Sequence, residues 1–272
     1  MADYDQIYDL VLKLVKEGGA LIKETISRPK NVEVKSCDVD LVTETDKQVE
    51  KLLMDGISSK FPDHRFIGEE TTASGVKVEL TDSPTWIIDP VDGTMNFVHG
   101  FPHTCISIAL VDKKIPQIGM VYNPVMEQLF TARKGKGAFL NGKPIHVSDV
   151  KEMKKAILMF EMGTSRDPAK MKIVMENLAI LAPLIHGTRA LGSAALNMCM
   201  VALGGADCNF EYGIHAWDIA AGDIIVREAG GVCIDPSGGP FDVLSRRVLC
   251  ASTQELADEV TKVLVQYYPE RD

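Results

Sequence analysis

Residues 86–97 read Trp-Ile-Ile-Asp-Pro-Val-Asp-Gly-Thr-Met-Asn-Phe, and the rest of the chain is organised around them. Residues 86–88 are apolar and strand-forming, which predicts a short buried strand. Pro90 has no N–H for a sheet and restricts the residue before it, so we expect the strand to end at Asp89. Asp89 and Asp92 then lie three positions apart on a tight connection, where both carboxylates can converge.

The two residues that follow these acids are suited to an anion. Gly93 lets the backbone come close to a ligand. If a helix begins here, the N–H groups of Gly93 and Thr94 are free to face a phosphate. Two carboxylates beside such N–H groups suit Mg²⁺ and phosphate together. The alternative is a polar turn between strand and helix without a ligand, and the stretch alone leaves both interpretations open.

Several sequence blocks resemble the signatures of one enzyme family. The string from Asp89 to Thr94, with an aromatic residue before it and Asn-Phe after it, closely resembles the signature of the inositol monophosphatase family. Residues 217–222 (Trp-Asp-Ile-Ala-Ala-Gly), running on to 228–231, resemble the family's second signature. The resemblance extends in order and spacing along nearly the whole chain, and the animal members are the most similar. Further matching blocks lie at 41–46, 66–70 and 211–215.

Length and composition are those of an ordinary globular protein. The chain has 272 residues, of which 46% are hydrophobic and 25% are charged, and it can bury a substantial core. No apolar run approaches the roughly 20 residues that span a bilayer. The acidic N-terminus has no apolar signal core, and the six cysteines include no Cys-x-x-Cys pair. We therefore expect a cytoplasmic protein with reduced thiols and no membrane partner.

The formal net charge of −9 argues against a nucleic-acid partner. The same charge would repel a small-molecule phosphate monoester from the protein. Bound divalent metal ions reverse the local sign of the charge and would remove this difficulty.

Apolar periodicity and turn residues predict helices and strands in mixed order. The segment 71–84 is rich in Thr, Ser and Gly and is expected to be a surface loop, and 30–43 is a polar segment with a hairpin near 36–40. Helices are expected at 4–26, from 43–46 to just before Pro62, and at 167–181, 193–203 and 216–229, with a last one opened by a capping box at 252–255. Strands are expected at 66–68, 86–89, 105–111, 115–122, 128–133, 157–161, 208–212, 232–235 and 248–251.

One motif points to a different function. Residues 137–143 match the phosphate-binding loop spacing of nucleotide hydrolases, but Pro144 occupies the place of the Ser or Thr that would hold Mg²⁺. Asn141-Gly142 is also a strong hairpin signal between two apolar runs. We therefore predict a hairpin at this place.

The expected fold class is α/β or α+β. A charged linker near 148–155 suggests a boundary between residues 1–147, an N-terminal half with most metal ligands, and residues 148–272, which carry Glu211 and Asp218. We expect the two halves to work as one functional unit. The resemblance implies alternating α-β-α-β-α layers and a homodimer.

Four acids stand where strands end or helices begin: Glu69, Asp89, Asp92 and Asp218. No His/Cys cluster has ligand spacing, which argues against zinc, and oxygen ligands that leave room for water and phosphate suit Mg²⁺. Alone, each acid could be a solvated surface residue, but their joint order and spacing favour a metal site. The resemblance implies one ion at Glu69, Asp89 and the Val91 carbonyl, a second at Asp89, Asp92 and Asp218, and a weaker third at Glu69.

No Ser, Cys or His is placed as an obvious nucleophile, so we infer direct attack by water that the metal activates. Thr94 can hold this water, Asp46 can accept the Thr94 proton, and Glu69 can assist through the ion. A Thr in a turn beside a helical Asp is otherwise usually a cap, and the resemblance supports the catalytic role. The phosphate would rest on the N–H groups of Gly93 and Thr94.

Glu211 is the candidate for substrate choice, because a carboxylate accepts two hydroxyl groups of a polyol well. The resemblance implies that Asp92 and the backbone at Ser193 and Ala194 complete this pocket. It also implies that Asp218 lies near the ester oxygen.

Two neighbouring side chains have two interpretations each. His215, next to Trp217, could be a general base, but we favour a structural support for the turn before Asp218. Lys35 could order the following loop near the metal ions, or it could be a solvated lysine, and the sequence leaves this open.

The predicted function is a Mg²⁺-dependent phosphomonoesterase that hydrolyses myo-inositol monophosphates to inositol and phosphate. Two to three ions in each active site and sensitivity to lithium are implied by the resemblance. Fructose 1,6-bisphosphate would need a cationic cluster for its second phosphate, which the pocket segments lack. A 3′-phosphoadenosine phosphate would need a base pocket, which the sequence does not exclude. A non-catalytic metal-binding scaffold should have lost at least one of the metal or Thr94 positions, and all are present.

Overall fold

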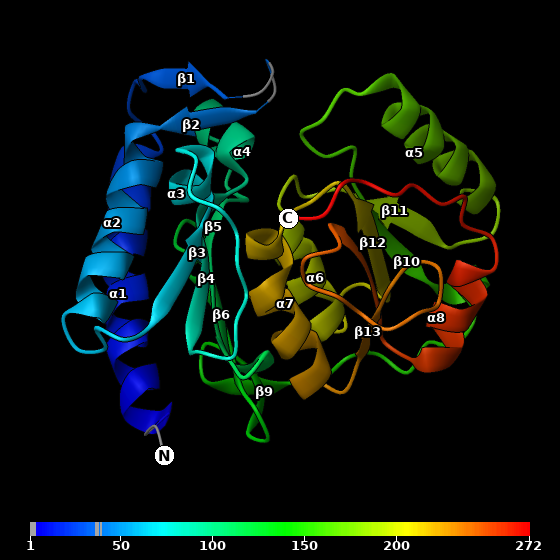
Figure 1. Ribbon diagram of the computed structural model, residues 1–272. Coiled ribbons are helices and arrows are strands. Elements are labelled where there is room, and N and C mark those ends of the chain that lie inside the picture. Colours follow the sequence, from blue (N-terminus) through cyan, green and yellow to red (C-terminus); the bar gives the residue numbers. More distant parts are fainter. Residues whose placement is uncertain (1–3, 36–37, 39) are drawn as a thin grey trace.

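Five alternating layers of helices and sheets make up the chain in the computed structural model, which describes residues 4–35, 38 and 40–272 (Figure 1). Helices α1 (Tyr4–Thr25) and α2 (Glu44–Ser58) cover the outer face of a seven-stranded sheet. Helices α6 (Ala194–Ala202) and α7 (Ala216–Glu228) fill the centre, and α5 (Pro168–Leu181) and α8 (Gln254–Thr261) cover a second sheet. The predicted α-β-α-β-α layering is confirmed.

The larger sheet has the strand order β3-β4-β5-β6-β7-β8-β9. Its first pair, β3 with β4, is parallel, and all later neighbours are antiparallel. The strands are β3 (Arg65–Gly68), β4 (Thr85–Asp92), β5 (Cys105–Asp112), β6 (Ile115–Asn123), β7 (Gln128–Arg133), β8 (Gly137–Leu140) and β9 (Lys143–Ile145).

The smaller sheet has the order β11-β10-β12-β14-β13 and mixes parallel and antiparallel pairs. Its edge strand β11 was not expected from the sequence, because Gly187–Arg189 has no apolar alternation. The other strands are β10 (Ile157–Phe160), β12 (Cys208–Tyr212), β13 (Val232–Ile234) and β14 (Arg247–Ala251).

Helix α7 lies deep in the protein, because a sheet lies on each side of its layer (Figure 1). Ten of its residues are buried, among them Ile219, Ile224 and Val226. A helix that is apolar on nearly every side is stable only inside a protein. This placement carries Asp218, in the first turn of α7, into the interior.

The stretch from which the sequence analysis started folds differently from the prediction. Strand β4 does not end at Asp89, because its pairing with β5 resumes at Asp92 opposite Cys105. The register shifts between Asp89 and Asp92, and this irregularity accommodates Pro90, which has no N–H to donate. The two acids therefore lie on a buried strand end and not on a loose connection.

Other boundaries are mostly confirmed. Helix α2 begins within the expected 43–46, where Thr43 caps it through a capping box, and the hairpin signal at Asn141-Gly142 is confirmed by positive φ angles at both residues, 50° and 76°. The surface loop expected at 71–84 begins later, because α3 (Glu69–Ala73) covers its first residues. The last helix is capped by Thr253 and not by Ser252.

A short ribbon stands at the top of the first layer in Figure 1. Strands β1 (Val32–Val34) and β2 (Leu41–Thr43) pair antiparallel, as the expected hairpin requires. Residues 36, 37 and 39 within that turn, including Cys37, lie outside the described residues. The division of the chain between residues 147 and 148 stays a prediction.

Candidate active site

A cavity of about 630 Å³ opens where the end of β4 meets the first turns of α6 and α7. Residues from both halves of the chain line it, although more than a hundred positions separate some of them in the sequence. Ten of the predicted site residues line this cavity: Glu69, Asp89, Val91, Asp92, Gly93, Thr94, Ser193, Ala194, Glu211 and Asp218.

The centre of the cavity is an acidic cluster. Asp89, Asp92 and Asp218 each offer a carboxylate oxygen, and these oxygens lie within 4.8 Å of one another. Asp89 is 2% exposed and Asp92 is 6% exposed. Hard oxygen donors at this spacing fit a divalent cation such as Mg²⁺, because three crowded carboxylates, two of them buried, repel one another without a cation.

The pKa values of the carboxyl groups in the cluster are raised by burial and by this crowding. Burial raises the pKa of Asp89 well above its usual value, and the neighbouring charges of Glu69, Asp92 and Asp218 raise it further. Burial and the charge of Asp218 raise the pKa of Asp92 to about 7, although hydrogen bonds from Ser193 and Ala195 oppose this. The metal-free cluster therefore holds protons that a bound cation would displace.

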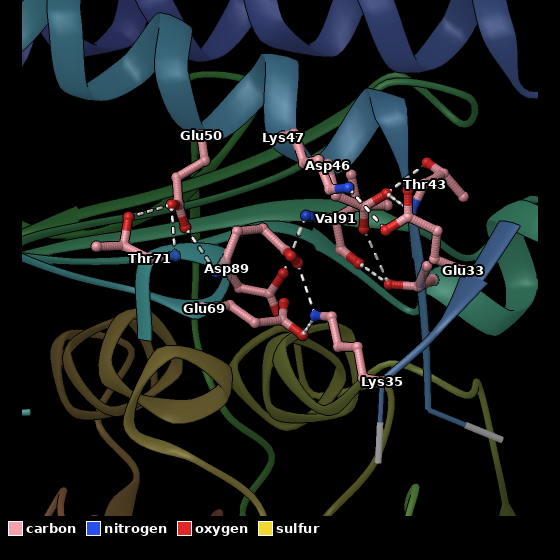
Figure 2. Close-up of polar contacts among 12 residues, drawn as sticks. Glu33, Lys35, Thr43, Asp46, Lys47, Glu50, Glu69, Thr71, Asp89 and Val91 are labelled. Carbon is pink, nitrogen blue, oxygen red and sulfur yellow. Dashed lines mark hydrogen bonds and ion pairs between the residues drawn. The ribbon is translucent and has the colours of Figure 1, made fainter. Parts of the chain in front are cut away.

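Glu69 lies at the edge of this cluster and is paired with a lysine (Figure 2). Lys35 Nζ donates to Glu69 Oε1 and to Glu70 Oε1, each at 2.7 Å. Burial raises the pKa of Glu69, and the Lys35 charge opposes this shift. With a side chain 14% exposed, Lys35 is not a solvated surface lysine.

Thr94 and Asp46 are connected behind the cluster. Thr94 Oγ1 lies 2.9 Å from the Val91 carbonyl and 3.2 Å from Asp46 Oδ1, and its single hydrogen can be donated to either oxygen. The Thr43 N–H donates to the other oxygen of Asp46, Oδ2, at 2.9 Å (Figure 2). Burial outweighs this bonding and raises the pKa of Asp46 to about 6. An acceptor of this acidity can exchange a proton near neutral pH.

Gly93 turns the chain from β4 into the short helix α4 (Thr94–His99) with a φ of 83°, in the left-handed region. A Cβ at this position would lie 2.9 Å from the His103 carbonyl oxygen and 3.0 Å from that of Gly192. The site therefore has no room for a side chain at residue 93, and the backbone stays accessible from the cavity.

The second half of the chain is attached to the cluster at the start of α6. Asp92 Oδ2 accepts hydrogen bonds from Ser193 Oγ at 2.6 Å and from the Ala195 N–H at 2.8 Å. Nearby, Asn96 Nδ2 donates to the Leu191 carbonyl at 2.7 Å. These bonds hold Ser193 and Ala194 at the cavity wall.

The contacts of His215 are those of a structural support. The backbone N–H of His215 donates to Asp218 Oδ2 at 2.6 Å, and the His215 ring stacks on that of Trp217 with the centroids 4.5 Å apart. His215 Nδ1 lies 2.6 Å from Asp272 Oδ1, and the other carboxylate oxygen of Asp272 accepts from the Ala216 N–H. The turn that presents Asp218 is fixed by these bonds.

Sequence reasoning missed two buried or linking charges near the cavity. Asp272 lies far from every motif in the sequence and reaches α7 only through the path of the C-terminal segment (Figure 1). Lys170 lies in the first turn of α5 and is 2% exposed, behind the wall that carries Glu211. No local pattern marks either residue, since a Lys in a first helical turn is usually solvated.

The family model described as the inositol monophosphatase family matches residues 3–268. The chain belongs to this family. Inositol monophosphatase 1 of Bos taurus is 48% identical over 264 residues, which cover 96% of this chain and 95% of that protein. The matches confirm that this family member is a phosphatase, as the sequence predicts.

Solved structures of family members have the same fold. An IMPase of Thermotoga maritima has a TM-score of 0.84 and 34% identity over 95% of this chain and 96% of that one. The Staphylococcus aureus enzyme SaIMPase-II, in a structure with inositol monophosphate bound, has a TM-score of 0.80 and 25% identity over 95% of this chain and 93% of that one. The same enzyme has also been solved with 2′AMP bound.

In this phosphatase, no helix of the described segments is long and apolar enough to cross a bilayer.

Proposed function

We propose that this protein hydrolyses inositol monophosphates to inositol and phosphate with Mg²⁺ as its cofactor. One observation carries the proposal: a single cavity joins the Asp89, Asp92 and Asp218 cluster to the carboxylate of Glu211. The first group suits a metal with a phosphate, and the second suits the hydroxyl groups of a polyol. The structure of SaIMPase-II with inositol monophosphate supports this choice of substrate.

We expect the donor set to hold two to three Mg²⁺ ions. Glu69, Asp89 and the Val91 carbonyl would hold one ion, and Asp89, Asp92 and Asp218 would hold another, with a weaker third at Glu69. When bound, Mg²⁺ would lower the pKa of the attacking water and neutralise the phosphate charge. Asp89 belongs to both sets, which makes it the most important single ligand.

Thr94 and Asp46 would accept the proton of the attacking water, one after the other. Thr94 Oγ1 would accept a hydrogen from the water while donating its own to Asp46, which lies 3.2 Å away. Burial raises the pKa of Asp46 to about 6, so the carboxylate is largely ionised at neutral pH and still able to accept a proton. Glu69 would assist at the edge of the cluster.

The backbone would hold the phosphate and the pocket would hold the alcohol. The N–H groups of Gly93 and Thr94 would donate to phosphate oxygens. Glu211 would accept two hydroxyl hydrogens of the inositol ring, with Asp92, Ser193 and Ala194 completing the wall. Asp218 would lie near the ester oxygen, where the alcohol must take up a proton as it leaves.

A nucleotide monophosphate is the second candidate substrate. The reason is specific: SaIMPase-II has also been solved with 2′AMP bound. Related activities on fructose 1,6-bisphosphate or a 3′-phosphoadenosine phosphate remain alternatives, whereas a non-catalytic scaffold disagrees with the family match.

The deciding experiment measures phosphate release from four substrates: inositol 1-phosphate, 2′AMP, fructose 1,6-bisphosphate and 3′-phosphoadenosine 5′-phosphate. Each is assayed with Mg²⁺ and with a chelator. We expect release that needs Mg²⁺ and is fastest from inositol 1-phosphate. A faster rate from a nucleotide or from the bisphosphate would reject inositol monophosphates as the preferred substrate, and release that survives the chelator would reject the metal mechanism.

Three further properties belong to the same proposal. We expect inhibition by lithium, a homodimer in solution and a cytoplasmic location. Titration of the Mg²⁺-dependent rate with LiCl tests the first property, and sedimentation equilibrium tests the second. Fractionation of the source cells tests the third.

A further inference from the structure

Lys170 is a charged group that the chemistry above does not use. It is 2% exposed, and its Nζ makes no hydrogen bond with any residue that the structure describes. A buried ammonium without a partner is costly, so it is retained only where its charge has a use.

The ammonium lies directly behind the wall of the cavity. A Cβ on Gly163, whose φ is 69°, would lie 2.6 Å from Lys170 Nζ and 3.5 Å from Glu211 Oε1. A Cβ on Gly213 would lie 3.3 Å from the same nitrogen. Both glycines and Glu211 line the cavity. The two glycines therefore leave the space in which the ammonium approaches the carboxylate.

Glu211 needs a cation at this place. Its Oε2 is buried without a hydrogen bond, and burial raises the pKa of its carboxyl group well above the usual value. The charges of Glu161, Asp218 and Asp92 raise the pKa further, and the charge of Lys170 opposes them. Without the lysine, the pKa of this carboxyl group would rise further, and the protonated form accepts hydroxyl hydrogens less well than the carboxylate.

The two neighbouring arginines already have hydrogen-bond acceptors. Arg166 Nη1 donates to the Gly163 carbonyl at 2.7 Å, and Arg246 Nη2 donates to the Gly213 carbonyl at 3.2 Å. Both charges repel Lys170, and burial together with this repulsion lowers its pKa, while Glu211 and Asp218 oppose the change. Lys170, by contrast, has an ammonium without a hydrogen bond among the described residues, and its charge opposes the raised pKa of Glu211.

We propose that Lys170 is a positioning residue for substrate choice. Its buried ammonium stands behind Glu211, favours the ionised form of this carboxylate and attracts the polyol end of the bound substrate only through that carboxylate, which accepts the hydroxyl hydrogens. Lys170 does not itself line the cavity among the described residues, so it acts through Glu211 and not by touching the substrate. The inference rests on the proposed function, because it needs a substrate whose hydroxyl groups reach Glu211.

The test compares two phosphate esters. Inositol 1-phosphate carries ring hydroxyl groups, whereas 4-nitrophenyl phosphate has none for Glu211 to accept. The variant Lys170→Met keeps the apolar length of the side chain and removes the charge. Lys172→Met is the matched control, because Lys172 is an exposed lysine on the same helix α5. The readout is the ratio of kcat/KM for inositol 1-phosphate to kcat/KM for 4-nitrophenyl phosphate, with thermal denaturation of each variant.

For Lys170→Met we expect this ratio to fall about tenfold, the size of one lost hydrogen bond to a charged group, mainly through a higher KM for inositol 1-phosphate. Lys172→Met should keep the ratio of the unaltered protein. In the Glu211→Gln background, the further change Lys170→Met should lower the ratio little, because the group that it positions is already neutral. If Lys170→Met fails to fold, Lys170→Gln replaces it in every comparison.

The outcomes separate the two claims. If the unaltered protein hydrolyses 4-nitrophenyl phosphate with Mg²⁺ but does not prefer inositol 1-phosphate, the proposed substrate is wrong, and the Lys170 role fails with it. If the unaltered protein has the preference and folded Lys170→Met keeps it, only the Lys170 inference is overturned. Equal falls of the ratio with and without Glu211→Gln would also overturn it, since the lysine would then act by another route.

Discussion

The acidic cluster and Glu211 line the same cavity, but the charges around their carboxylates differ. Asp89, Asp92 and Asp218 crowd together and form no ion pair with a Lys or Arg of the described chain, so their charge can be balanced only by a cation from solution. Glu211, at the other end, has the buried ammonium of Lys170 behind it. The first group therefore depends on a cation from solution, whereas the second has a cation of the protein nearby that opposes the effect of burial on its pKa.

The strongest way to break this comparison is Asp89→Asn. This change removes the carboxylate that both proposed metal sites share. We expect kcat to fall about a thousandfold, as when a major charge contact of the transition state is lost. Phosphate release from inositol 1-phosphate at saturating Mg²⁺ measures the loss. Asp63→Asn, on an exposed turn, is the control and should keep full activity. If the Asp89→Asn protein still released phosphate from inositol 1-phosphate with Mg²⁺ at the unaltered rate, the metal mechanism would be refuted.

A smaller loss is expected from Thr94→Val, which keeps the shape of the side chain and removes the hydroxyl group. The water would lose its acceptor and its link to Asp46, so kcat should fall about a hundredfold with KM little changed. Thr94→Ser restores the hydroxyl group and should recover most of the rate. Steady-state kinetics of the two variants test whether the hydroxyl group has a catalytic role. Equal activity of Val and Ser at this position would leave the hydroxyl group without a catalytic role.

Glu211→Gln sharpens the comparison from the other end. We expect kcat/KM for inositol 1-phosphate to fall about tenfold, because a neutral amide accepts hydroxyl hydrogens less strongly than a carboxylate. The same constant for 4-nitrophenyl phosphate should change little, and Glu176→Gln, exposed on α5, should change neither. If both substrates lost the same factor, Glu211 would not be a specificity residue.

The smallest expected effect concerns stability without metal. Burial raises the pKa of Asp92 to about 7 and that of Asp218 to about 6, both above the ordinary value of 3.8 for an Asp in the unfolded chain. Between roughly pH 4 and pH 7 the folded metal-free protein therefore binds more protons than the unfolded chain, and its free energy of unfolding falls as pH rises. In the presence of chelator we expect Tm to be roughly 5 °C lower at pH 8 than at pH 5.5.

Calorimetry with and without Mg²⁺ measures this effect. The added ion should raise Tm mainly at pH 8, where the cluster is ionised. The Asp89→Asn variant is the control, because one charge fewer weakens the repulsion and should reduce the fall. An equal fall in that variant would place the cause of the pH dependence outside the cluster.

Most local features of this protein follow from short stretches of its sequence. Thr43 and Asp46 form the capping box of α2, and Asn141-Gly142 makes the hairpin between β8 and β9, because each depends on residues within a few positions. The one prominent local error concerns Pro90. The missing N–H of this proline predicts that the strand ends at Asp89, but pairing with β5 resumes at Asp92 after a shift in register. Pairing with a neighbouring strand can continue past a proline after an irregularity, and the position of that irregularity depends on the sheet.

The candidate site divides in the same way. Motif resemblance predicted the members of the acidic cluster and Glu211, and the fold brings all of them to one cavity. Lys170 and Asp272 could not be predicted, since Glu211 is 41 positions from Lys170 and His215 is 57 positions from Asp272, and no local pattern distinguishes the two residues from solvated surface charges. The sequence by itself determined most of the elements, with β11 and α3 as exceptions, and most of the acids that line the cavity. Only the tertiary structure decided which charges lie buried together, because burial and Coulomb energies depend on distances in space and not on positions along the chain.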